Sequence, residues 1–371
     1  MAAIIDFVYH YIFWFLVVLT VLVFVHELGH YLVARWNNVR VEIFSIGFGP
    51  ELFGWNNRAG TRWKISAIPL GGYVKMFGDA DPASMPAADL PEMTAEEREV
   101  AFHHKRLSQR AAVVFAGPAM NFVFAIAAFA VLYAVVGQPF TPPQVGRVQP
   151  GSAAEAAGVQ AGDTIAAIDG QSIQRFEDVQ RIVRLDPGQP LAVVVHRGDQ
   201  NVSLSVTPKL SEVTDRFGNK HQYALLGIEG QGVQYVRYNP VTAVVRATGE
   251  TADVVAGTLQ AVWQMIIGAR GTGDLGGPLR IAQYSGEIST LGPAAIVGLM
   301  AVLSINLGLI NLFPIPVLDG GHLLFYVAEA VRGRPLGQRA QEYGFRFGLA
   351  LVLTLMVFAT WNDLVHFWSR S

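Results

Sequence analysis

Long apolar runs divide the chain into segments suited to lipid and segments suited to water. Four runs are long and apolar enough to cross a bilayer as helices, and they cover residues 8–33, 111–136, 293–313 and 345–367. A fifth run, 254–267, is shorter and mixed with polar residues, so we expect an amphipathic helix at the membrane interface. The pattern predicts a polytopic α-helical membrane protein with about four transmembrane helices.

Alternating hydrophobic and polar residues predict β-structure between these runs. Residues 41–50 and 62–76 alternate and are bounded by glycines, which predicts a membrane-associated β-hairpin. Residues 143–210 combine short alternating stretches with turn residues, so we expect an inserted aqueous domain there. Further β-structure is expected in 211–238, before a helical stretch over 240–267.

The distribution of basic residues predicts how the chain is oriented. The loop between the first two runs, residues 31–110, carries ten Lys and Arg, and the loop before the last run carries four more, Arg332, Arg334, Arg339 and Arg346. Because basic loops stay on the cytoplasmic side, both loops should be cytoplasmic and both chain ends extracytoplasmic. The long segment between the second and third runs then lies on the opposite, extracytoplasmic side.

These patterns predict the following order of segments. They are a first transmembrane helix in 1–33, a cytoplasmic β-rich loop in 34–110, a second transmembrane helix in 111–136, the inserted domain in 143–210, an extracytoplasmic β segment with an amphipathic helix in 211–292, and the third and fourth transmembrane helices in 293–371.

Composition agrees with this organisation and excludes several classes of protein. Hydrophobic residues make up 51% of the 371 residues, charged residues make up 15%, and the mean hydropathy is +0.34. A net charge of −2 without a basic stripe predicts no nucleic-acid partner. The sequence has no cysteine, which excludes disulfides, thiolate zinc ligands and cysteine nucleophiles. The first run lacks a basic segment before it, so we expect a retained helix rather than a cleaved signal peptide.

Three ionisable residues, His26, Glu27 and His30, stand at the end of the first apolar run. Ionisable groups at membrane depth are costly, so they are rare unless they have a function. Residues i and i+4 share a helix face, so both histidines can direct a ring nitrogen at one metal ion. Glu27 lies beside them, where it can take a proton from a metal-activated water. The alternative is a histidine pair that reaches the membrane interface and binds no metal.

A third metal ligand is expected beyond the third run, because zinc usually has three protein ligands. Pro314 and Pro316 must end the third helix, and a broken helix is tolerated in a membrane where it lines a cavity. Asp319 follows them at the cytoplasmic end of its span, at the depth of the histidine pair, and is the predicted ligand. His322 is the alternative ligand, and a helix N-cap is the alternative role for Asp319.

Two segments have the character of peptide-binding elements. The strand that contains Gly71 and Gly72 could hold a substrate extended by main-chain hydrogen bonds, or it could be a structural hairpin that covers the helices. Residues 146–165 and 168–173 resemble a PDZ domain, in which a peptide C-terminus adds as a strand. The alternative for this segment is a PDZ-shaped plug that filters substrates by size.

The motifs together resemble the site-2 protease family (M50) of intramembrane zinc metalloproteases, and most closely its bacterial branch that regulates sigma-E. They are HExxH in the first span, Gly-Phe-Gly in the first loop, the PDZ insertion, and Asn-x-x-Pro-x-Pro-x-Leu-Asp-Gly in a later span. The resemblance implies Zn²⁺ held by His26, His30 and Asp319, with Glu27 as catalytic base. It also implies a set of substrate-binding residues: Asn306, Asn311, Gly71, Gly72 and Tyr73.

The resemblance further implies partners and a location. Substrates of the family are single-span membrane proteins, such as anti-sigma factors and leftover signal peptides, that an upstream site-1-type protease has already trimmed. The implied location is the bacterial inner membrane, with the active site toward the cytoplasm and the PDZ domain in the periplasm. Members that act as stress proteases often carry two tandem PDZ domains, whereas this sequence contains one recognisable copy.

Overall fold

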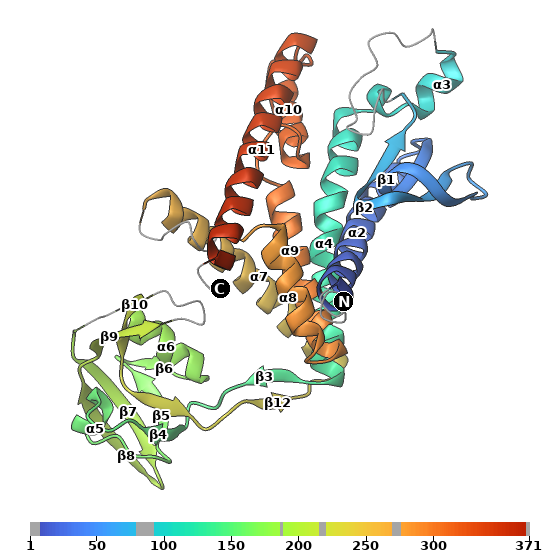
Figure 1. Ribbon diagram of the computed structural model, residues 1–371. Coiled ribbons are helices and arrows are strands. Elements are labelled where there is room, and N and C mark those ends of the chain that lie inside the picture. The colour runs from blue at the N-terminus through green and yellow to red at the C-terminus, as the bar shows by residue number, and fades with distance from the viewer. Residues whose placement is uncertain (1–7, 79–92, 186–187, 215–219, 269–275, 369–371) are drawn as a thin grey trace. The chain divides into compact units, whose positions relative to one another are not determined.

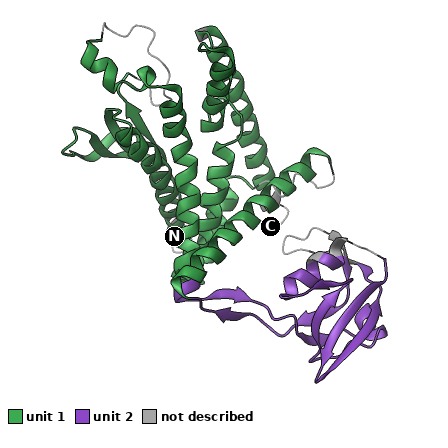
Figure 2. Cartoon of the chain, turned by 180° about the vertical axis from the view of Figure 1, so that it is seen from behind, with its two compact units in different colours: residues 1–132, 239–369, 371 green, residues 133–238, 370 purple. Residues whose placement is uncertain are grey.

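The structure is a computed structural model that describes residues 8–78, 93–185, 188–214, 220–268 and 276–368 (Figure 1). Within them the chain forms two compact units (Figure 2). The helical unit comprises residues 1–132 and 239–369, and the β-rich unit comprises residues 133–238. The chain ends, for which we predicted an extracytoplasmic location, fall in residues 1–7 and 369–371, outside the described residues.

The helical unit contains the long apolar helices that the sequence predicted. Four described helices are long and apolar enough to cross a membrane, namely Tyr9–Trp36, Leu107–Val135, Pro293–Asn311 and Arg339–Val365. The helix bounds are η1 Val8–Phe13, α2 Trp14–Trp36, α3 Ala95–Val100, η2 Phe102–His104, α4 Leu107–Val135, α7 Pro240–Ile266, α8 Pro278–Ser289, α9 Pro293–Asn311, α10 Asp319–Arg332 and α11 Gln338–Trp368. The prediction of about four spans is confirmed, and α2 and α4 each extend about one turn beyond the predicted ends.

Helix α7 includes the short mixed run for which we predicted an amphipathic helix. Its N-cap is Asn239, whose side chain accepts a hydrogen bond from the main-chain N–H of Thr242 at 2.9 Å, and Pro240 occupies the first helical position. The helix then runs without a break to Ile266 and is not among the four candidate spans.

The first loop forms an antiparallel hairpin of β1 (Val41–Asn56) and β2 (Arg62–Met76). The first strand is six residues longer than predicted, and the register shifts at several bulges between Ile43 and Phe53. Phe44 is fully buried against α2, where its ring lies 5.7 Å from that of Tyr31. The ring of Trp63 stacks on Phe44 at 4.1 Å, so an aromatic cluster fixes the hairpin beside the helix.

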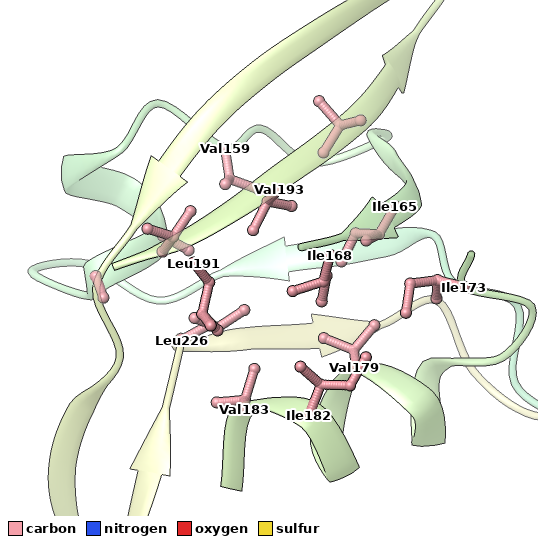
Figure 3. Packing of buried hydrophobic residues seen from close by; sticks show 14 of the residues in the cluster. Val159, Ile165, Ile168, Ile173, Val179, Ile182, Val183, Leu191, Val193 and Leu226 are labelled. Atoms are coloured by element: carbon pink, nitrogen blue, oxygen red, sulfur yellow. The ribbon is translucent and has the colours of Figure 1, made fainter. Parts of the chain in front are cut away.

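The β-rich unit is built around a four-stranded antiparallel sheet in the order β6-β5-β7-β8. Its core consists of the inward-facing side chains of this sheet and of α6, among them Ile165, Ile168, Val193 and Val179 (Figure 3). The bounds are β3 Gln138–Phe140, β4 Val145–Val148, α5 Ala153–Ala156, β5 Thr164–Ile168, β6 Gln171–Ser172, α6 Phe176–Leu185, β7 Leu191–Arg197, β8 Gln200–Val206, β9 Lys209–Thr214, β10 Lys220–Leu225, β11 Ile228–Gly230 and β12 Gln234–Val236.

The boundaries predicted for the inserted domain, 143 and 210, fall inside this unit. Strand β11 pairs with β4, and Ala224 and Leu226 are buried in the same core as the central sheet. Residues 211–238 therefore complete the unit instead of forming a separate β segment. At its base β3 pairs with β12, and the N–H of Tyr238 donates to the carbonyl of Tyr133 at 3.2 Å. The chain thus enters and leaves the unit at one place.

Candidate metal centre

Helix α2 carries the predicted histidine pair on one face. The rings of His26 and His30 have centroids 4.8 Å apart, and their Nε2 atoms lie 3.2 Å apart. His30 is only 9% exposed, and its Nδ1 donates to the carbonyl of Val113 on α4 at 2.9 Å. Gly29 lies between the histidines, and a Cβ there would overlap the Ala116 carbonyl, so this glycine allows α4 to approach closely.

Asp319 reaches the histidine pair from the first turn of α10. Helix α9 ends at Asn311, before the two prolines, and α10 begins at Asp319. Gly320 and Gly321 have no side chains, and a Cβ on either would collide with main-chain atoms of the turn, so the chain folds back tightly here. Asp319 is the first helical residue and not the N-cap, which is Leu318. Its Oδ2 lies 3.2 Å from His26 Nε2 and 3.5 Å from His30 Nε2.

This donor set fits a tetrahedral zinc ion. Ligands at 2.0–2.1 Å from a tetrahedral zinc are about 3.3 Å from one another, and the three separations here are 3.2, 3.2 and 3.5 Å. The Oδ2 atom of Asp319 is buried and makes no hydrogen bond within the described residues, as expected of an oxygen that coordinates a cation.

Glu27 and the hairpin lie on the same cavity, of about 190 Å³. The main chain of Val74 on β2 hydrogen bonds to Glu27, and Gly72 and Tyr73 also line the cavity. A Cβ on Gly72 would lie 3.2 Å from Cγ of Glu27, so β2 approaches the glutamate as closely as a bare backbone allows. Gly71 lies one residue further, with φ +145°, and packs under the ring of Phe48.

The two asparagines of the third span have different surroundings in the structure. Asn311 lines the cavity beside the histidine pair. Asn306 is not among the lining residues, and its side-chain oxygen accepts a hydrogen bond from Thr258 Oγ1 on α7 at 3.1 Å. His322, the alternative ligand, lines the cavity but stays outside the group of three ligand atoms, and its ring packs 5.2 Å from that of Phe345.

Helix α4 contributes two residues to the metal centre that were not predicted from the sequence. The side chain of Asn121 lies 3.1 Å from Nδ1 of His26, and Gly117 lies directly against the ring of His30. A lone amide inside an apolar run is a signal that could have drawn attention to Asn121. Nothing local to the sequence indicates that α4 packs on the histidine face.

Comparison with known proteins identifies the family. Residues 14–355 match the family model described as Peptidase family M50. The chain belongs to this family. A protein of Agrobacterium fabrum that is named as a zinc metalloprotease is 49% identical over 359 residues, which cover 95% of each chain. The Metalloprotease MmpA of Caulobacter vibrioides is 39% identical over 373 residues, which cover 94% of each chain. The M50 member described here is therefore a zinc-dependent metalloprotease of the membrane.

Solved structures match a smaller part of the chain. The PDZ domain of HtrA3, bound to a phage-derived ligand, is 23% identical, with a TM-score of 0.18 over 20% of this chain and 81% of that domain. The PDZ domain of an SdrC-like protein from Listeria monocytogenes is 21% identical, with a TM-score of 0.20 over 24% of this chain and 88% of that domain.

Proposed function

We propose that the protein is an intramembrane endopeptidase that cleaves transmembrane segments of single-span membrane proteins. The observation that carries this proposal is the convergence of His26, His30 and Asp319 beside Glu27, at the second half of a helix long enough to cross a membrane. We assign the first three as zinc ligands and Glu27 as the catalytic base. Zinc, when bound there, supplies a Lewis acid that polarises the scissile carbonyl and lowers the pKa of water.

The side chains around the cavity would perform the remaining steps. Glu27 takes a proton from the attacking water and returns it to the nitrogen of the departing amine. The carboxylate stays close to the ligands because β2 and the main chain of Val74 hold it from one side. Asn311 lines the same cavity and could donate to the carbonyl oxygen as charge develops on it.

The substrate must unwind before it is cut, because a helix buries its carbonyls in its own hydrogen bonds. The hairpin strand at Gly71, Gly72 and Tyr73 would hold the opened segment extended by main-chain pairing. Gly72 and Tyr73 lie on the cavity, which places this strand next to the proposed base. Asn306 would act at the substrate only if its hydrogen bond to Thr258 were exchanged, so we assign the polar contact to Asn311 instead.

The family and the charge pattern support a proposal for the location and the biological substrates. We propose a multi-pass protein of the bacterial inner membrane, with the active site toward the cytoplasm and the β-rich unit in the periplasm. This unit would exclude intact proteins and admit those that an upstream site-1-type protease has trimmed. Anti-sigma factors and leftover signal peptides are the substrate types that we propose.

Substitution of the proposed base tests this function. Purified Glu27→Gln should retain one zinc per chain but cleave a model single-span substrate about 10²- to 10⁴-fold more slowly. His26→Ala should lose both the zinc and the activity. Full cleavage by Glu27→Gln would favour a scaffold whose β-rich unit recruits partners, and zinc binding that varies with a transmembrane ion gradient would favour a transporter.

A further inference from the structure

One stripe of α4 lies along the histidine pair. Val113, Gly117 and Asn121 are spaced at i, i+4 and i+8, so they share one face of the helix. The carbonyl of Val113 accepts from His30 Nδ1 at 2.9 Å, and the amide of Asn121 lies 3.1 Å from His26 Nδ1. Each histidine therefore directs Nε2 toward Asp319 and Nδ1 toward α4.

Asn121 is held firmly in this position although its side chain is only partly satisfied. The residue is completely buried, and its main-chain carbonyl accepts from Ser304 Oγ on α9 at 3.0 Å. Gly308, also on α9, has no side chain and so lets α9 pack against Cβ of Asn121. The side-chain Oδ1 is buried and has no hydrogen-bond partner among the described residues. A buried amide with an unpaired oxygen costs free energy, so an apolar residue would be favoured here unless the amide has a task.

The tautomer of His26 gives the amide such a task. Where Asn121 Nδ2 donates to His26 Nδ1, the ring hydrogen must be on Nε2, the atom that faces Asp319. A nitrogen that carries hydrogen cannot bind a metal, so zinc ligation through Nε2 requires the hydrogen on Nδ1. That tautomer needs an acceptor at the position of the amide. Oδ1 belongs to the same planar group, and half a turn about χ2 exchanges it with Nδ2.

We propose that Asn121 is a positioning residue that fixes His26 in its zinc-binding tautomer, by accepting the Nδ1–H through Oδ1. The proposal rests on the assignment of His26 as a zinc ligand. Val113 performs the equivalent task for His30 with a main-chain carbonyl, which only accepts. Asn121 differs because its amide is able to serve either tautomer of His26. Hydrogen bonds of this kind orient metal-bound imidazoles and strengthen them as ligands.

Two substitutions at this position should differ in their effect on zinc binding. Asn121→Leu has a similar size and neither donates nor accepts, so zinc affinity should fall about 10- to 100-fold. Asn121→Asp supplies an acceptor of the same shape, so its zinc affinity should stay within about threefold of wild type or exceed it. Ser285→Ala, which removes a buried side-chain hydrogen bond to the carbonyl of Ile281 within α8 and does not line the cavity, is the matched control and should bind zinc like wild type.

The measurement is zinc affinity of the purified full-length protein in detergent, by competition with a chromophoric chelator, with thermal unfolding of each variant as a check of folding. Wild-type affinity in Asn121→Leu would overturn the proposal, and so would an equal loss in Asn121→Asp, because Asn121 would then serve packing alone. If Asn121→Leu does not fold, a loss of zinc affinity in Asn121→Asp still overturns the proposal. Failure of the wild type to bind one zinc would instead contradict the proposed function.

Discussion

The absence of a side chain at Gly117 is as important to the metal centre as the ligands themselves. A Cβ on this residue would overlap the His30 imidazole. Gly117→Ala should therefore displace the imidazole and lower zinc affinity by at least about tenfold, because a site of this kind tolerates only about 0.5 Å of error. Chelator competition measures the change.

A second glycine provides the control for this prediction. Gly298 is also inside an apolar helix, and a Cβ there would meet only Leu132 Cδ1, at 3.8 Å. Gly298→Ala should leave zinc affinity unchanged and stabilise α9 slightly, because alanine is the better helix former. Equal zinc affinities for Gly117→Ala and wild type would show that the His30 ring can move without loss of the ligand set.

A substitution at Gly72 tests the position of the catalytic base independently of the zinc ligands. A Cβ on Gly72 would lie 2.8 Å from the Ser45 carbonyl and 3.2 Å from Glu27 Cγ, so Gly72→Ala should shift either the strand or the base. Cleavage should fall about 10- to 100-fold, because small displacements of reacting groups are expensive in rate. Zinc content should not change, since the three atoms nearest to the added Cβ belong to Ser45, Val23 and Glu27 and not to a ligand. A loss of zinc together with activity would mean that the strand supports the ligands as well. Ala67→Val, at an exposed position of β2, is the control.

The site residues differ in how far the sequence could reveal them. The histidine pair follows from helix geometry, because the i and i+4 positions share a face whatever the tertiary structure. Asp319 could be predicted as a ligand because the two prolines end the helix before it and because the cytoplasmic ends of the first and third spans are expected at the same depth. Asn121 could not, because its position depends on how α4 crosses α2, and no local pattern records that crossing. Asn306 was expected at the substrate, but packing of α9 against α7 directs its side chain to Thr258.

At the scale of elements, a partly buried ion pair links two strands of the β-rich unit. Arg197, at the end of β7, donates to both carboxylate oxygens of Asp163 at 2.7 Å, and Asp163 is 1% exposed. The hydrogen bonds of Arg197, with one from the main chain of Gln160, lower the pKa of the Asp163 carboxyl against the effect of burial. Asp163 therefore joins the β5 end of the sheet to β7.

The lowered pKa gives this pair a definite pH dependence. A carboxyl with a lower pKa in the folded state stabilises above its unfolded pKa of about 3.9, and the effect is lost as the pH falls through the folded value. In a fragment of residues 133–238, Asp163→Asn should lower the unfolding temperature by several degrees at pH 7. This difference should shrink steadily below about pH 4.

The matched control is an exposed aspartate of the same unit. Asp199 is exposed in the turn between β7 and β8, and Asp199→Asn should follow the wild-type curve from pH 7 to pH 3. Thermal unfolding by circular dichroism provides the measurement. A gap between Asp163→Asn and wild type that stays constant with pH would assign the loss to packing and not to the charge.

Elements were predictable to the extent that their signals are local. The spanning helices depend on continuous apolar runs, so their number was right, and their ends were off by up to about two turns, the largest difference being at the start of α11. The end of the β-rich unit was missed because β11 pairs with β4 from about eighty residues away. Burial of Ala224 and Leu226 depends on that pairing, so the alternation around 210 could not indicate where the unit closes.

At the scale of the whole molecule, the β-rich unit is an insertion whose ends meet. Strands β3 and β12 pair from Gln138↔Val236 to Phe140↔Gln234, and Tyr133 and Tyr238 are joined by a main-chain hydrogen bond. The core of the unit is formed by its own residues, and the proposed ligands and base belong to the helical unit. Insertions of this kind can be removed without cutting through a core.

Replacement of residues 138–236 by a short Gly-Ser linker therefore tests the role of the unit as a filter. The shortened protein should retain one zinc per chain, and it should cleave an untrimmed single-span substrate at least about tenfold faster than the full chain, since an excluded substrate would gain access. A substrate that has already lost its outer part should be cleaved at the same rate by both proteins. Cleavage is measured on purified protein in the same detergent, with Glu27→Gln in the shortened background to exclude a contaminating protease.

An unchanged rate on the untrimmed substrate would contradict a filter and favour a unit that binds substrate tails. In that case the shortened protein should instead cleave the trimmed substrate more slowly.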